Sequence, residues 1–427
     1  MLTLTIERLG INGEGIARLE GYTIFIAGAL PGETVLAELY EQKSRYGRAQ
    51  LIKILSSSPK RQQPSCPYFG SCGGCQLMHL DYQAQLETKR QRVQDAMERI
   101  GKLKVEVHPC IPSPDPLAYR NKIQMPIVSG RLGLYAYNSH DLVEIDSCKI
   151  HCHLGDQLFQ KIQKLLQSSS EKIKHLLIKT AINTKEALVI FVTAEKATAG
   201  LQDLAQQILS TMPEVKGVIQ NINSTSSNTI LGDTFHTLAG NDAIEEILCG
   251  LKFKVSPASF FQVNPAQAEQ LYQKVAEFAA LTGEEHLLDA YCGVGTLSLI
   301  LAKGAKQMTG IECVAPAIKD AEENARKNGI ANATFICAPA EEGIKALEKV
   351  DVAIVNPPRK GCEGEFLDCL ARLKPRRIIY ISCDPATLAR DIAILSAKGF
   401  QVEAVQPFDM FPQTAHVETV VKIQKIK

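Results

Sequence analysis

Residues 286–303, HLLDAYCGVGTLSLILAK, begin as an apolar run, turn at two glycines and continue with apolar residues at helical spacing. The run predicts a buried strand, and the segment after Gly295 predicts a helix. Gly293 and Gly295 form a G-x-G turn, in which glycine lets the backbone bend tightly and approach a ligand without a clash at Cβ. The third glycine and the Lys-Ser/Thr pair of phosphate-binding loops are missing. The stretch therefore indicates a strand, a ligand loop and a helix.

The region after Pro257 repeats this alternation. Strand-like runs are HLLDAY, QMTGIE, ATFICA, DVAIVN, RRIIYIS and HVETVVKIQ, and helical segments are TLSLILAK, APAIKDAEENARKN, EFLDCLARL and PATLARDIAILSA. Strands that alternate with helices favour right-handed βαβ units and a parallel sheet. Ligands of such sheets bind beyond the carboxyl ends of the strands. We predict an α/β domain over residues 256–427.

Three polar side chains at strand ends suggest the ligand. Asp289 precedes the G-x-G turn, and Glu312 ends the second run, where an acid binds the two hydroxyls of a ribose. Two acids in these positions favour S-adenosylmethionine over NAD. Asn356 follows the fourth run in an Asn-Pro-Pro-Arg turn, which presents an amide and a proline-fixed carbonyl toward the reacting group. We therefore predict an S-adenosylmethionine site at this edge of the sheet.

Cys383 and Glu418 are the candidate catalytic residues. Cys383 lies in ISCDP directly before a helix, whose N-terminus is expected to lower the thiol pKa. Uracil C5 is a poor nucleophile, but addition of a thiolate at C6 makes an enolate that can attack a methyl group. A base must then take the C5 proton so that the cysteine is eliminated, and Glu418 suits that task.

The first 58 residues predict a small barrel. Five strand-like runs, TLTIERL, GIARLEG, YTIFIAGAL, ETVLAELYE and RAQLIKILS, are separated by glycine-bearing turns. This fits an OB-like barrel, a fold that often holds oligonucleotides. Residues 42–80 hold no acid but six bases: Lys43, Arg45, Arg48, Lys53, Lys60 and Arg61. They fit either a solvated strand face or a patch for the RNA backbone.

Residues 59–255 predict a central α+β domain. Strand-like runs (IVSGRLGLYAY, ALVIFVTA, VKGVIQNIN) mix there with helical ones (LGDQLFQKIQKLLQ, LQDLAQQILSTM). Before them, residues 82–104 show helical spacing with one apolar face: Leu86, Val93, Met97 and Ile100.

A cysteine cluster in this region predicts a metal centre. Cys66, Cys72 and Cys75 form a C-x5-C-x2-C run with glycines that let the loop wrap, and Cys148 or Cys152 is the candidate fourth ligand. Structural zinc sites usually pair two C-x2-4-C halves. One tight triplet plus a remote cysteine is closer to iron–sulfur ligation, which we favour over zinc.

Composition limits the class of protein. The 427 residues suggest two or three domains, and 45% hydrophobic with 22% charged residues is an ordinary globular composition. A net charge of +1 excludes a globally basic nucleic-acid binder but allows a local basic patch. The sequence has no apolar stretch of membrane-spanning length and no signal-peptide pattern, so we expect a cytoplasmic protein. No obligate protein partner is evident.

These motifs together resemble the RNA uracil-C5 methyltransferases, specifically the iron–sulfur branch that modifies large-subunit ribosomal RNA. The resemblance covers the whole chain and includes CPYFGSCGGC, FFQVN, DAYCGVGTLSL, ISCDPATLARD and HVETVV. It implies a class I, Rossmann-like S-adenosylmethionine-dependent methyltransferase domain, a TRAM barrel at the N-terminus and a central iron–sulfur domain. The expected product is 5-methyluridine in 23S ribosomal RNA.

The resemblance also implies roles for individual residues. Cys383 would be the nucleophile and Glu418 the proton-abstracting base, and Arg359 would help to hold the RNA. The methyl-donor contacts would be Gln262, Tyr291, Glu312 and Asn356. The ligands of a 4Fe–4S cluster would be Cys66, Cys72, Cys75 and Cys148.

Two departures from the family pattern keep alternatives open. The family usually has Asp-Pro-Pro-Arg where this chain has Asn356, and an amide can donate as well as accept hydrogen bonds. The base choice could therefore differ, toward cytosine C5 or an exocyclic amine. The usual Ser-Cys-Asn-Pro is Ser-Cys-Asp-Pro here, and the charge of Asp384 is expected to raise the pKa of the thiol. Transfer RNA as substrate and a non-catalytic iron–sulfur RNA-binding protein are further alternatives.

Overall fold

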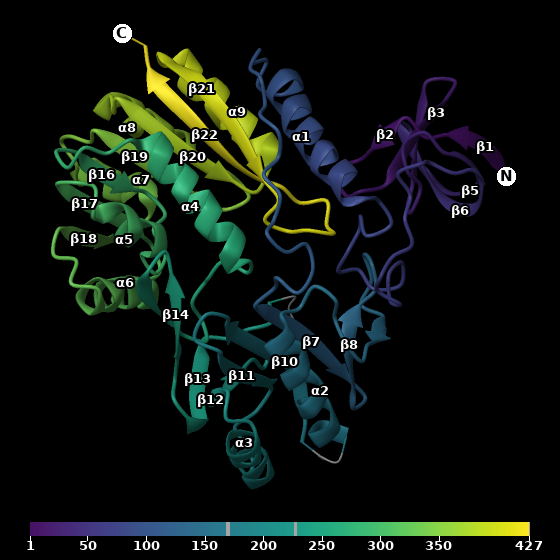
Figure 1. The fold of residues 1–427 in the computed structure, drawn as a ribbon, viewed down its shortest axis with the longest axis horizontal. Coiled ribbons are helices and arrows are strands. Elements are labelled where there is room, and N and C mark those ends of the chain that lie inside the picture. Colours follow the sequence, from purple (N-terminus) through teal and green to yellow (C-terminus); the bar gives the residue numbers. More distant parts are fainter. Residues whose placement is uncertain (168–170, 226–228, 427) are drawn as a thin grey trace.

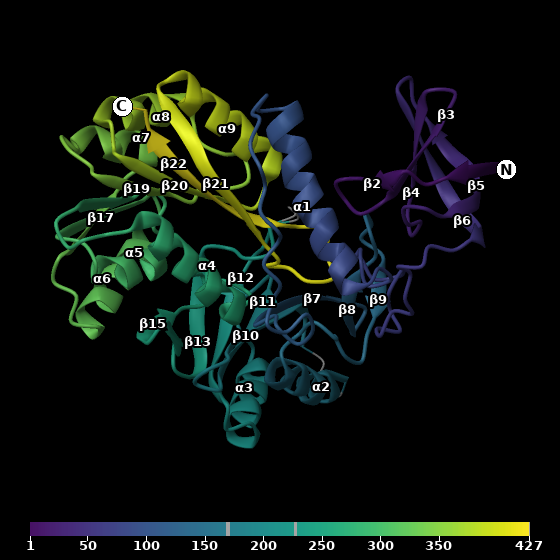
Figure 2. The ribbon, with the colours of Figure 1, turned by 45° about the horizontal axis from the view of Figure 1, so that its top comes forward.

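The computed structural model describes residues 1–167, 171–225 and 229–426. Figure 1 shows an N-terminal barrel, a central sheet with helices and a C-terminal sheet covered by helices. The helix α1 (Tyr82–Arg99) lies between the barrel and the C-terminal sheet, and Figure 2 shows the same placement from another side. This helix therefore forms the border between the first body and the last.

The N-terminal barrel has six strands: β1 (Leu2–Thr5), β2 (Arg8–Leu9), β3 (Gly15–Leu19), β4 (Tyr22–Ile26), β5 (Thr34–Gln42) and β6 (Tyr46–Ser56). Their order is β1-β5-β6-β4-β3-β2. Because β1 and β2 follow each other in the chain but pair at opposite edges, the sheet closes on itself, as the sequence predicts. The predicted run TLTIERL forms two strands, β1 and the two-residue β2, whereas each of the other four runs forms one.

The exit from the barrel is fixed by a buried ion pair. The side chain of Glu33 is 0% exposed and accepts two hydrogen bonds from Arg61, from Nε at 2.6 Å and from Nη2 at 2.8 Å. Backbone amides of Leu30 and Ser58 donate to the same carboxylate. Arg61 therefore serves the fold, and the proposed basic patch of the 42–80 segment loses this member.

The central body is a seven-stranded sheet of order β13-β12-β11-β10-β7-β8-β9. Its strands are β7 (Lys122–Val128), β8 (Arg131–Tyr135), β9 (Leu142–Glu144), β10 (Ile173–Ala181), β11 (Glu186–Thr193), β12 (Val215–Ile222) and β13 (Thr234–Gly240). Helices α2 (His153–Gln167) and α3 (Ala199–Thr211) share one hydrophobic core with the sheet. A second core joins it to the hairpin of β14 (Ile244–Leu248) and β15 (Leu251–Val255), which leads into the C-terminal body.

The C-terminal sheet has the order β18-β17-β16-β19-β20-β22-β21. Its strands are β16 (His286–Asp289), β17 (Gln307–Glu312), β18 (Ala333–Cys337), β19 (Val352–Val355), β20 (Arg377–Ser382), β21 (Phe400–Phe408) and β22 (Glu418–Lys425). All neighbours are parallel except β22, which is antiparallel to both β20 and β21. The expectation of a purely parallel sheet is thus wrong at this edge, and β21 was not predicted.

Two hydrophobic cores cover the two faces of this sheet. One core includes side chains of α4 (Pro265–Ala279), α5 (Thr296–Ala302) and α6 (Ala315–Lys327). The other includes α1 and side chains of α7 (Ala340–Gly343), the 3-10 turn Ile344–Ala346, α8 (Gly364–Leu373) and α9 (Pro385–Ala397). The strand order reverses between β16 and β19, which places a ligand crevice at their carboxyl ends.

The helix α1 packs on the C-terminal body through the face that its sequence predicts. Val93, Ala96 and Met97 are buried in the same core as Leu388 and Ile392 of α9. The prediction that Ile100 shares this face is wrong, because α1 ends at Arg99 and the Ile100 side chain is 49% exposed.

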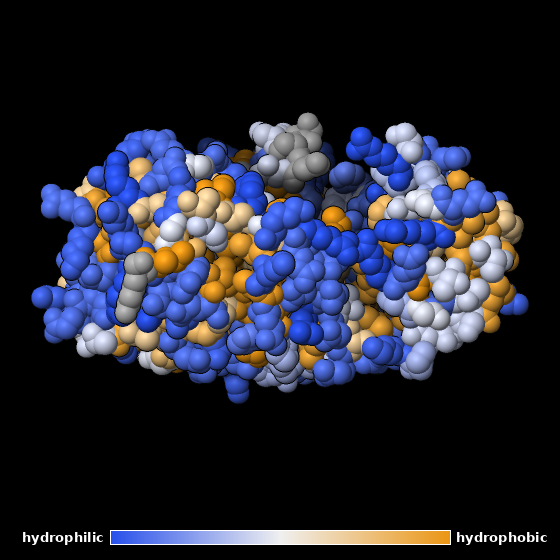
Figure 3. Space-filling model, turned by 90° about the horizontal axis from the view of Figure 1, so that it is seen from above, coloured by the Kyte–Doolittle hydropathy of each residue, from blue (hydrophilic) through white to orange (hydrophobic). Residues whose placement is uncertain are grey.

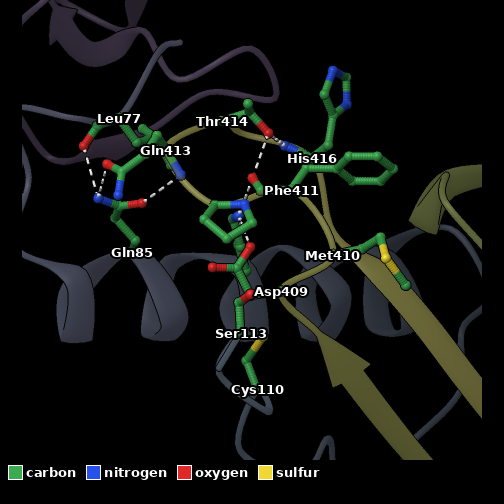
Figure 4. Close-up of polar contacts among 12 residues, drawn as sticks. Leu77, Gln85, Cys110, Ser113, Asp409, Met410, Phe411, Gln413, Thr414 and His416 are labelled. Atoms are coloured by element: carbon green, nitrogen blue, oxygen red, sulfur yellow. Dashed lines mark hydrogen bonds and ion pairs between the residues drawn. The ribbon is translucent and has the colours of Figure 1, made fainter. Parts of the chain in front are cut away.

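The loop between β21 and β22, residues 409–417, joins α1, the cysteine run and the last two strands. Lys89 of α1 forms an ion pair with Asp409, and their side chains are 1% and 0% exposed. Gln85 of α1 donates to the carbonyls of Leu77 and Leu80 and to the side chain of Gln413, as Figure 4 shows for Leu77 and Gln413. The Gln413 carbonyl in turn accepts from the backbone amides of Gln76 and Leu77. The loop is thereby held on several sides by buried polar contacts.

The surface is mixed. Figure 3 shows one face of the molecule, on which hydrophobic residues are interspersed among hydrophilic ones. In the part of the chain that the structure describes, none of the helices combines the length and apolar character needed to cross a membrane.

The Lys89–Asp409 pair gives a testable prediction. Lys89→Met leaves a buried carboxylate without its cation, so the free energy of unfolding should fall by about 3–5 kcal/mol. Urea denaturation measures this change. Lys43→Met is the control, because Lys43 pairs with Glu41 at an exposed position where ion pairs contribute less than about 1 kcal/mol. Equal losses in the two variants would show that the buried pair does not secure the loop.

Candidate active site

The register of the C-terminal sheet brings Cys383 and Glu418 together. In the antiparallel pair of β20 and β22, Ser382 lies opposite Thr419. Cys383 follows β20 directly and Glu418 is the first residue of β22, so the two residues are neighbours across the strands. The Cys383 thiol and the Glu418 carboxyl group belong to separate sequence motifs and thus meet at one end of the sheet.

Burial governs the charge of both groups. Glu418 is 5% exposed, and burial raises the pKa of its carboxyl group to about 8, although the charge of Arg359 acts in the opposite direction. Burial and then the charge of Glu418 raise the pKa of the Cys383 thiol, whereas Arg359 lowers it through its charge and a hydrogen bond. The prediction of a lowered thiol pKa is therefore wrong for the protein without substrate, because burial and Glu418 outweigh the helix N-terminus.

Asp384 has a structural task at this position. Its side chain accepts hydrogen bonds from the backbone amides of Ala386 at 2.8 Å and Thr387 at 3.2 Å and so caps α9. Aspartate and asparagine cap helices about equally well. The change from asparagine to aspartate thus preserves the turn that carries Cys383, and the raised thiol pKa comes first from burial.

The G-x-G loop and Glu312 meet at the neighbouring strand ends. Gly293 and Gly295 have φ angles of +55° and +78°, which residues with a side chain rarely adopt. Glu312 at the end of β17 accepts hydrogen bonds from the backbone amides of Gly293 at 3.2 Å and Val314 at 2.9 Å. Asp289 at the end of β16 is buried and accepts from the Ser298 hydroxyl at 2.5 Å. The loop and the acid that were predicted to hold the cofactor therefore touch.

The other predicted cofactor contacts lie on segments at the same edge. Tyr291 follows β16 and packs edge-on against Phe366, with ring centroids 5.6 Å apart. Asn356 follows β19, the neighbour of β16, and is half-buried. The side chain of Gln262 forms a hydrogen bond with the buried Tyr272, whose hydroxyl is also within the electrostatic influence of Asp289 and Glu418. Tyr291, Glu312 and Asn356 thus lie at the carboxyl ends of β16, β17 and β19, and Gln262 contacts α4 beside them.

Sequence reasoning missed Arg92. This residue belongs to α1, and its Nη1 donates to the Ala415 carbonyl at 2.6 Å in the loop before Glu418. The charges of Asp384, Arg359 and Cys383 all act on the pKa of Arg92, so its guanidinium lies close to the nucleophile. No local signal could have found it, because Arg92 comes almost three hundred residues before Cys383 in the chain.

Four cysteines line one cavity of about 380 Å³: Cys66, Cys72, Cys75 and Cys148. Their thiols influence one another electrostatically, and burial raises the pKa of Cys72, Cys75 and Cys148. In the described ranges, no group of three or more His, Cys, Asp or Glu side chains is arranged to hold a metal ion. Cys152, the alternative ligand, is buried and does not line this cavity.

The cysteine cavity reaches toward the nucleophile. Arg120, Lys149, Arg359 and His416 also line it, so its wall carries several basic side chains. The His416 ring packs edge-on against Phe411 and points away from the other labelled side chains in Figure 4. Arg359, which bonds Cys383, is therefore shared by the two sites.

Comparison with known protein families gives two matches. The model of the tRNA (Uracil-5-)-methyltransferase family matches residues 81–426, and that of the TRAM domain matches residues 1–52. An uncharacterized RNA methyltransferase of Listeria monocytogenes is 41% identical over 98% of this chain and 96% of its own length. Another, from Halalkalibacterium halodurans, is 40% identical over 99% of this chain and 97% of its own length.

A solved structure matches the whole chain. The Pyrococcus abyssi tRNA (uracil-54, C5)-methyltransferase, in complex with S-adenosyl-L-homocysteine, aligns with a TM-score of 0.78 and 28% identity, over 99% of this chain and 100% of that one. The predicted fold, a Rossmann-like α/β domain with a TRAM barrel and a central α+β body, is confirmed.

The burial of Glu418 predicts an unusual pH dependence of stability. Its folded pKa of about 8 lies above the ordinary value of 4.5, so the folded state holds a proton that the unfolded state releases between these values. The stability of the wild type relative to Glu418→Gln should therefore fall by about 1.4 kcal/mol per pH unit as the pH rises from 5 to 8. Urea denaturation of both proteins across this range measures the difference. Parallel stability curves would show that Glu418 is not held in its neutral form.

Proposed function

Because this chain belongs to the tRNA (uracil-5-)-methyltransferase family, we propose that it transfers a methyl group from S-adenosylmethionine to C5 of a uridine in RNA. The observation that carries the proposal is the meeting of Cys383, Glu418 and Arg359 beside the G-x-G loop and Glu312. A thiol next to a carboxyl group is what C5 methylation requires, whereas methylation of an amine needs no thiol.

Cys383 begins the reaction as the nucleophile. Its thiolate adds to C6 of the uracil ring, a C–S bond forms, and the electrons of the C5–C6 double bond pass toward C5 and the O4 carbonyl. When bound, S-adenosylmethionine supplies the methyl group that C5 then takes. Arg359 favours the thiolate, because its positive charge and hydrogen bonding lower the pKa of the Cys383 thiol. The arginine thereby counteracts the burial that otherwise keeps Cys383 protonated.

Glu418 ends the reaction as the base. Its carboxylate takes the C5 proton, the electrons of the C–H bond restore the C5–C6 double bond, and the C6–S bond breaks to release Cys383 as thiolate. Only the ionised form can act, and burial raises the pKa of Glu418 to about 8. Arg359 opposes this shift, so one guanidinium prepares both the nucleophile and the base.

The cofactor is assigned to the ends of β16, β17 and β19. Glu312 would bind the ribose hydroxyls, and Tyr291 and Gln262 would line the pocket beside them. Asn356 would face the reacting groups at the end of β19. Its amide can donate a hydrogen bond as well as accept one, so a cytosine or an exocyclic amine is the alternative target.

The RNA would be held by the TRAM barrel and by Arg92 and Arg359, with the target base flipped from its stack into the site. We propose 23S ribosomal RNA as the substrate, because the four-cysteine set matches the iron–sulfur branch that the sequence resembles. Transfer RNA is the alternative, favoured by the substrate named for the Pyrococcus abyssi protein. With either substrate, we propose that the protein acts in the cytoplasm.

We further propose that Cys66, Cys72, Cys75 and Cys148 hold a 4Fe–4S cluster. The shared cavity and the mutual influence of the four thiols support this assignment. Buried thiols with raised pKa values need a compensating positive charge to become thiolates, which bound iron supplies. Because the reaction itself transfers no electrons, we assign the cluster to folding and RNA positioning.

The mechanism predicts opposite behaviour for two variants. With labelled S-adenosylmethionine and unmodified ribosomal or transfer RNA, the wild type should form 5-methyluridine, identified by mass spectrometry of digested nucleosides. Cys383→Ala should lose this activity about 10³-fold or more. Glu418→Gln should instead accumulate a covalent protein–RNA adduct, visible on denaturing gels, because elimination stops.

Cys369→Ala is the matched control, since Cys369 is a buried cysteine of α8 that packs in the core. 5-Methylcytidine or an amino-methylated base would instead identify Asn356 as the cause of a changed target. RNA binding without any methylated product would favour the non-catalytic alternative.

The cluster assignment predicts iron and sulfide in the purified protein. Anaerobically isolated wild type should contain about four irons and four sulfides per chain, with a broad absorption near the visible range. Cys148→Ala should lose most of this iron, whereas Cys152→Ala should keep it, because Cys148 lines the cavity and Cys152 does not. Stoichiometric zinc in the place of iron would contradict the proposal.

A further inference from the structure

The turn of residues 358–362 carries Arg359 and is held by one helix. The Thr387 hydroxyl of α9 donates to the Arg359 carbonyl at 3.1 Å, and Arg390 Nη2 donates to the Lys360 carbonyl at 3.0 Å. The same helix directly follows Cys383 and Asp384. The arginine and the nucleophile therefore share a support, although they lie on different segments.

Asp391 is the centre of this support. Its side chain is 0% exposed, and it accepts hydrogen bonds from the Cys362 backbone amide at 2.8 Å, the Tyr380 hydroxyl at 2.6 Å and Arg390 Nε at 2.8 Å. The backbone of the turn lies directly on this carboxylate: a Cβ atom at Gly361, which has a φ of +78°, would come within 2.6 Å of Asp391 Oδ2. The turn thus depends on glycine at 361 and on the carboxylate beneath it.

The contacts of Asp391 lead to both halves of the active site. On one side, the Cys362 thiol lies 3.4 Å from the Tyr380 hydroxyl, and Tyr291, at the cofactor edge, also acts on the pKa of this thiol. On the other side, the turn carries Arg359, which lowers the pKa of the Cys383 thiol. Asp391 is thus connected to the cofactor edge through Tyr380 and Cys362, and to the nucleophile through the turn that carries Arg359.

We propose that Asp391 is a positioning residue, which holds the 358–362 turn so that Arg359 meets Cys383 while Tyr291 stays at the cofactor edge. The inference rests on the proposed function and adds a residue that touches none of the reacting groups. It acts through Arg359 and Cys362, and all its hydrogen-bond partners are donors.

An asparagine at 391 is a sharp probe of this role. It has nearly the same size, but one of its two terminal atoms is an NH₂ group that cannot accept. At least one of the three donors then loses its partner or faces another donor, which costs more than the mean hydrogen bond because the site is buried. The turn should shift, and Arg359 should leave the thiol.

The test measures the reactivity of Cys383 itself. Iodoacetamide alkylation is followed across pH by mass spectrometry of the peptide that contains Cys383, because the thiolate is the reactive form. In Asp391→Asn the thiol should titrate at higher pH, and alkylation near pH 8 should slow by about threefold or more, as expected when a thiolate loses a nearby cation. Arg359→Gln gives the upper limit of the effect. With RNA, kcat should fall more than KM rises.

Asp368→Asn is the matched control, because Asp368 is an exposed aspartate of α8 that pairs with Lys398. Arg390→Gln is the second variant, since the Arg390 side chain is 47% exposed and its removal frees the Lys360 carbonyl, while Asp391 keeps its hydrogen bonds from the Cys362 amide and the Tyr380 hydroxyl. It decides the question if Asp391→Asn does not fold.

A lower melting temperature with unchanged Cys383 alkylation in both variants would overturn the positioning role and leave a purely structural one. The alkylation result stands on its own. If the wild type forms no methylated RNA, the proposed function fails while the positioning of Arg359 is still decided.

Discussion

The buried ion pair of Lys89 and Asp409 is the contact on which the assembly of this protein depends. It joins α1 to the 409–417 loop, and that loop leads directly into Glu418. In the same loop, the Gln413 carbonyl accepts hydrogen bonds from the backbone amides of Gln76 and Leu77, directly after the cysteine run. The Ala415 carbonyl accepts one from the Arg92 guanidinium. Both side chains are shielded from solvent. Moving them apart would leave each buried charge without its partner, which is costly. The barrel side, the cysteine cavity and the catalytic base are thereby held in one arrangement.

The sequence predicts the fold where each strand is a short apolar run followed by a turn and an amphipathic helix. This holds for β16, β17, β19 and β20, and for the strands of the barrel. It fails for β21 (FQVEAVQPF), because this strand follows α9 after only Lys398 and Gly399 and is paired along its length with β22. Ile100 shows the same limit on a smaller scale: its spacing fits the apolar face of α1, but the helix ends one residue earlier.

The sequence predicts which residue types form the candidate site but not the pKa values of their side chains. Motifs at strand ends are local, so Cys383, Glu312 and Asn356 can be identified by position alone. The pKa of Cys383 depends on burial and on Glu418, which lies 35 residues further along the chain but is adjacent in space. Arg92 and Asp391 carry no signature, because a charged residue on a helix is usually a solvated one. The choice of Cys148 over Cys152 likewise needs the shape of the cavity.

The strand order has a consequence for how such a chain becomes active during synthesis. β22 comes after every other strand in the chain, yet it lies between β20 and β21 and contributes Glu418 from that interior position. The barrel, in contrast, closes with strands that all lie within the first 56 residues. A ribosome-bound nascent chain can therefore form its TRAM barrel early and expose Cys383 before Glu418, the proposed base, exists. The proposed site is complete only when β22 inserts, so until then Cys383 lacks its proposed partner Glu418.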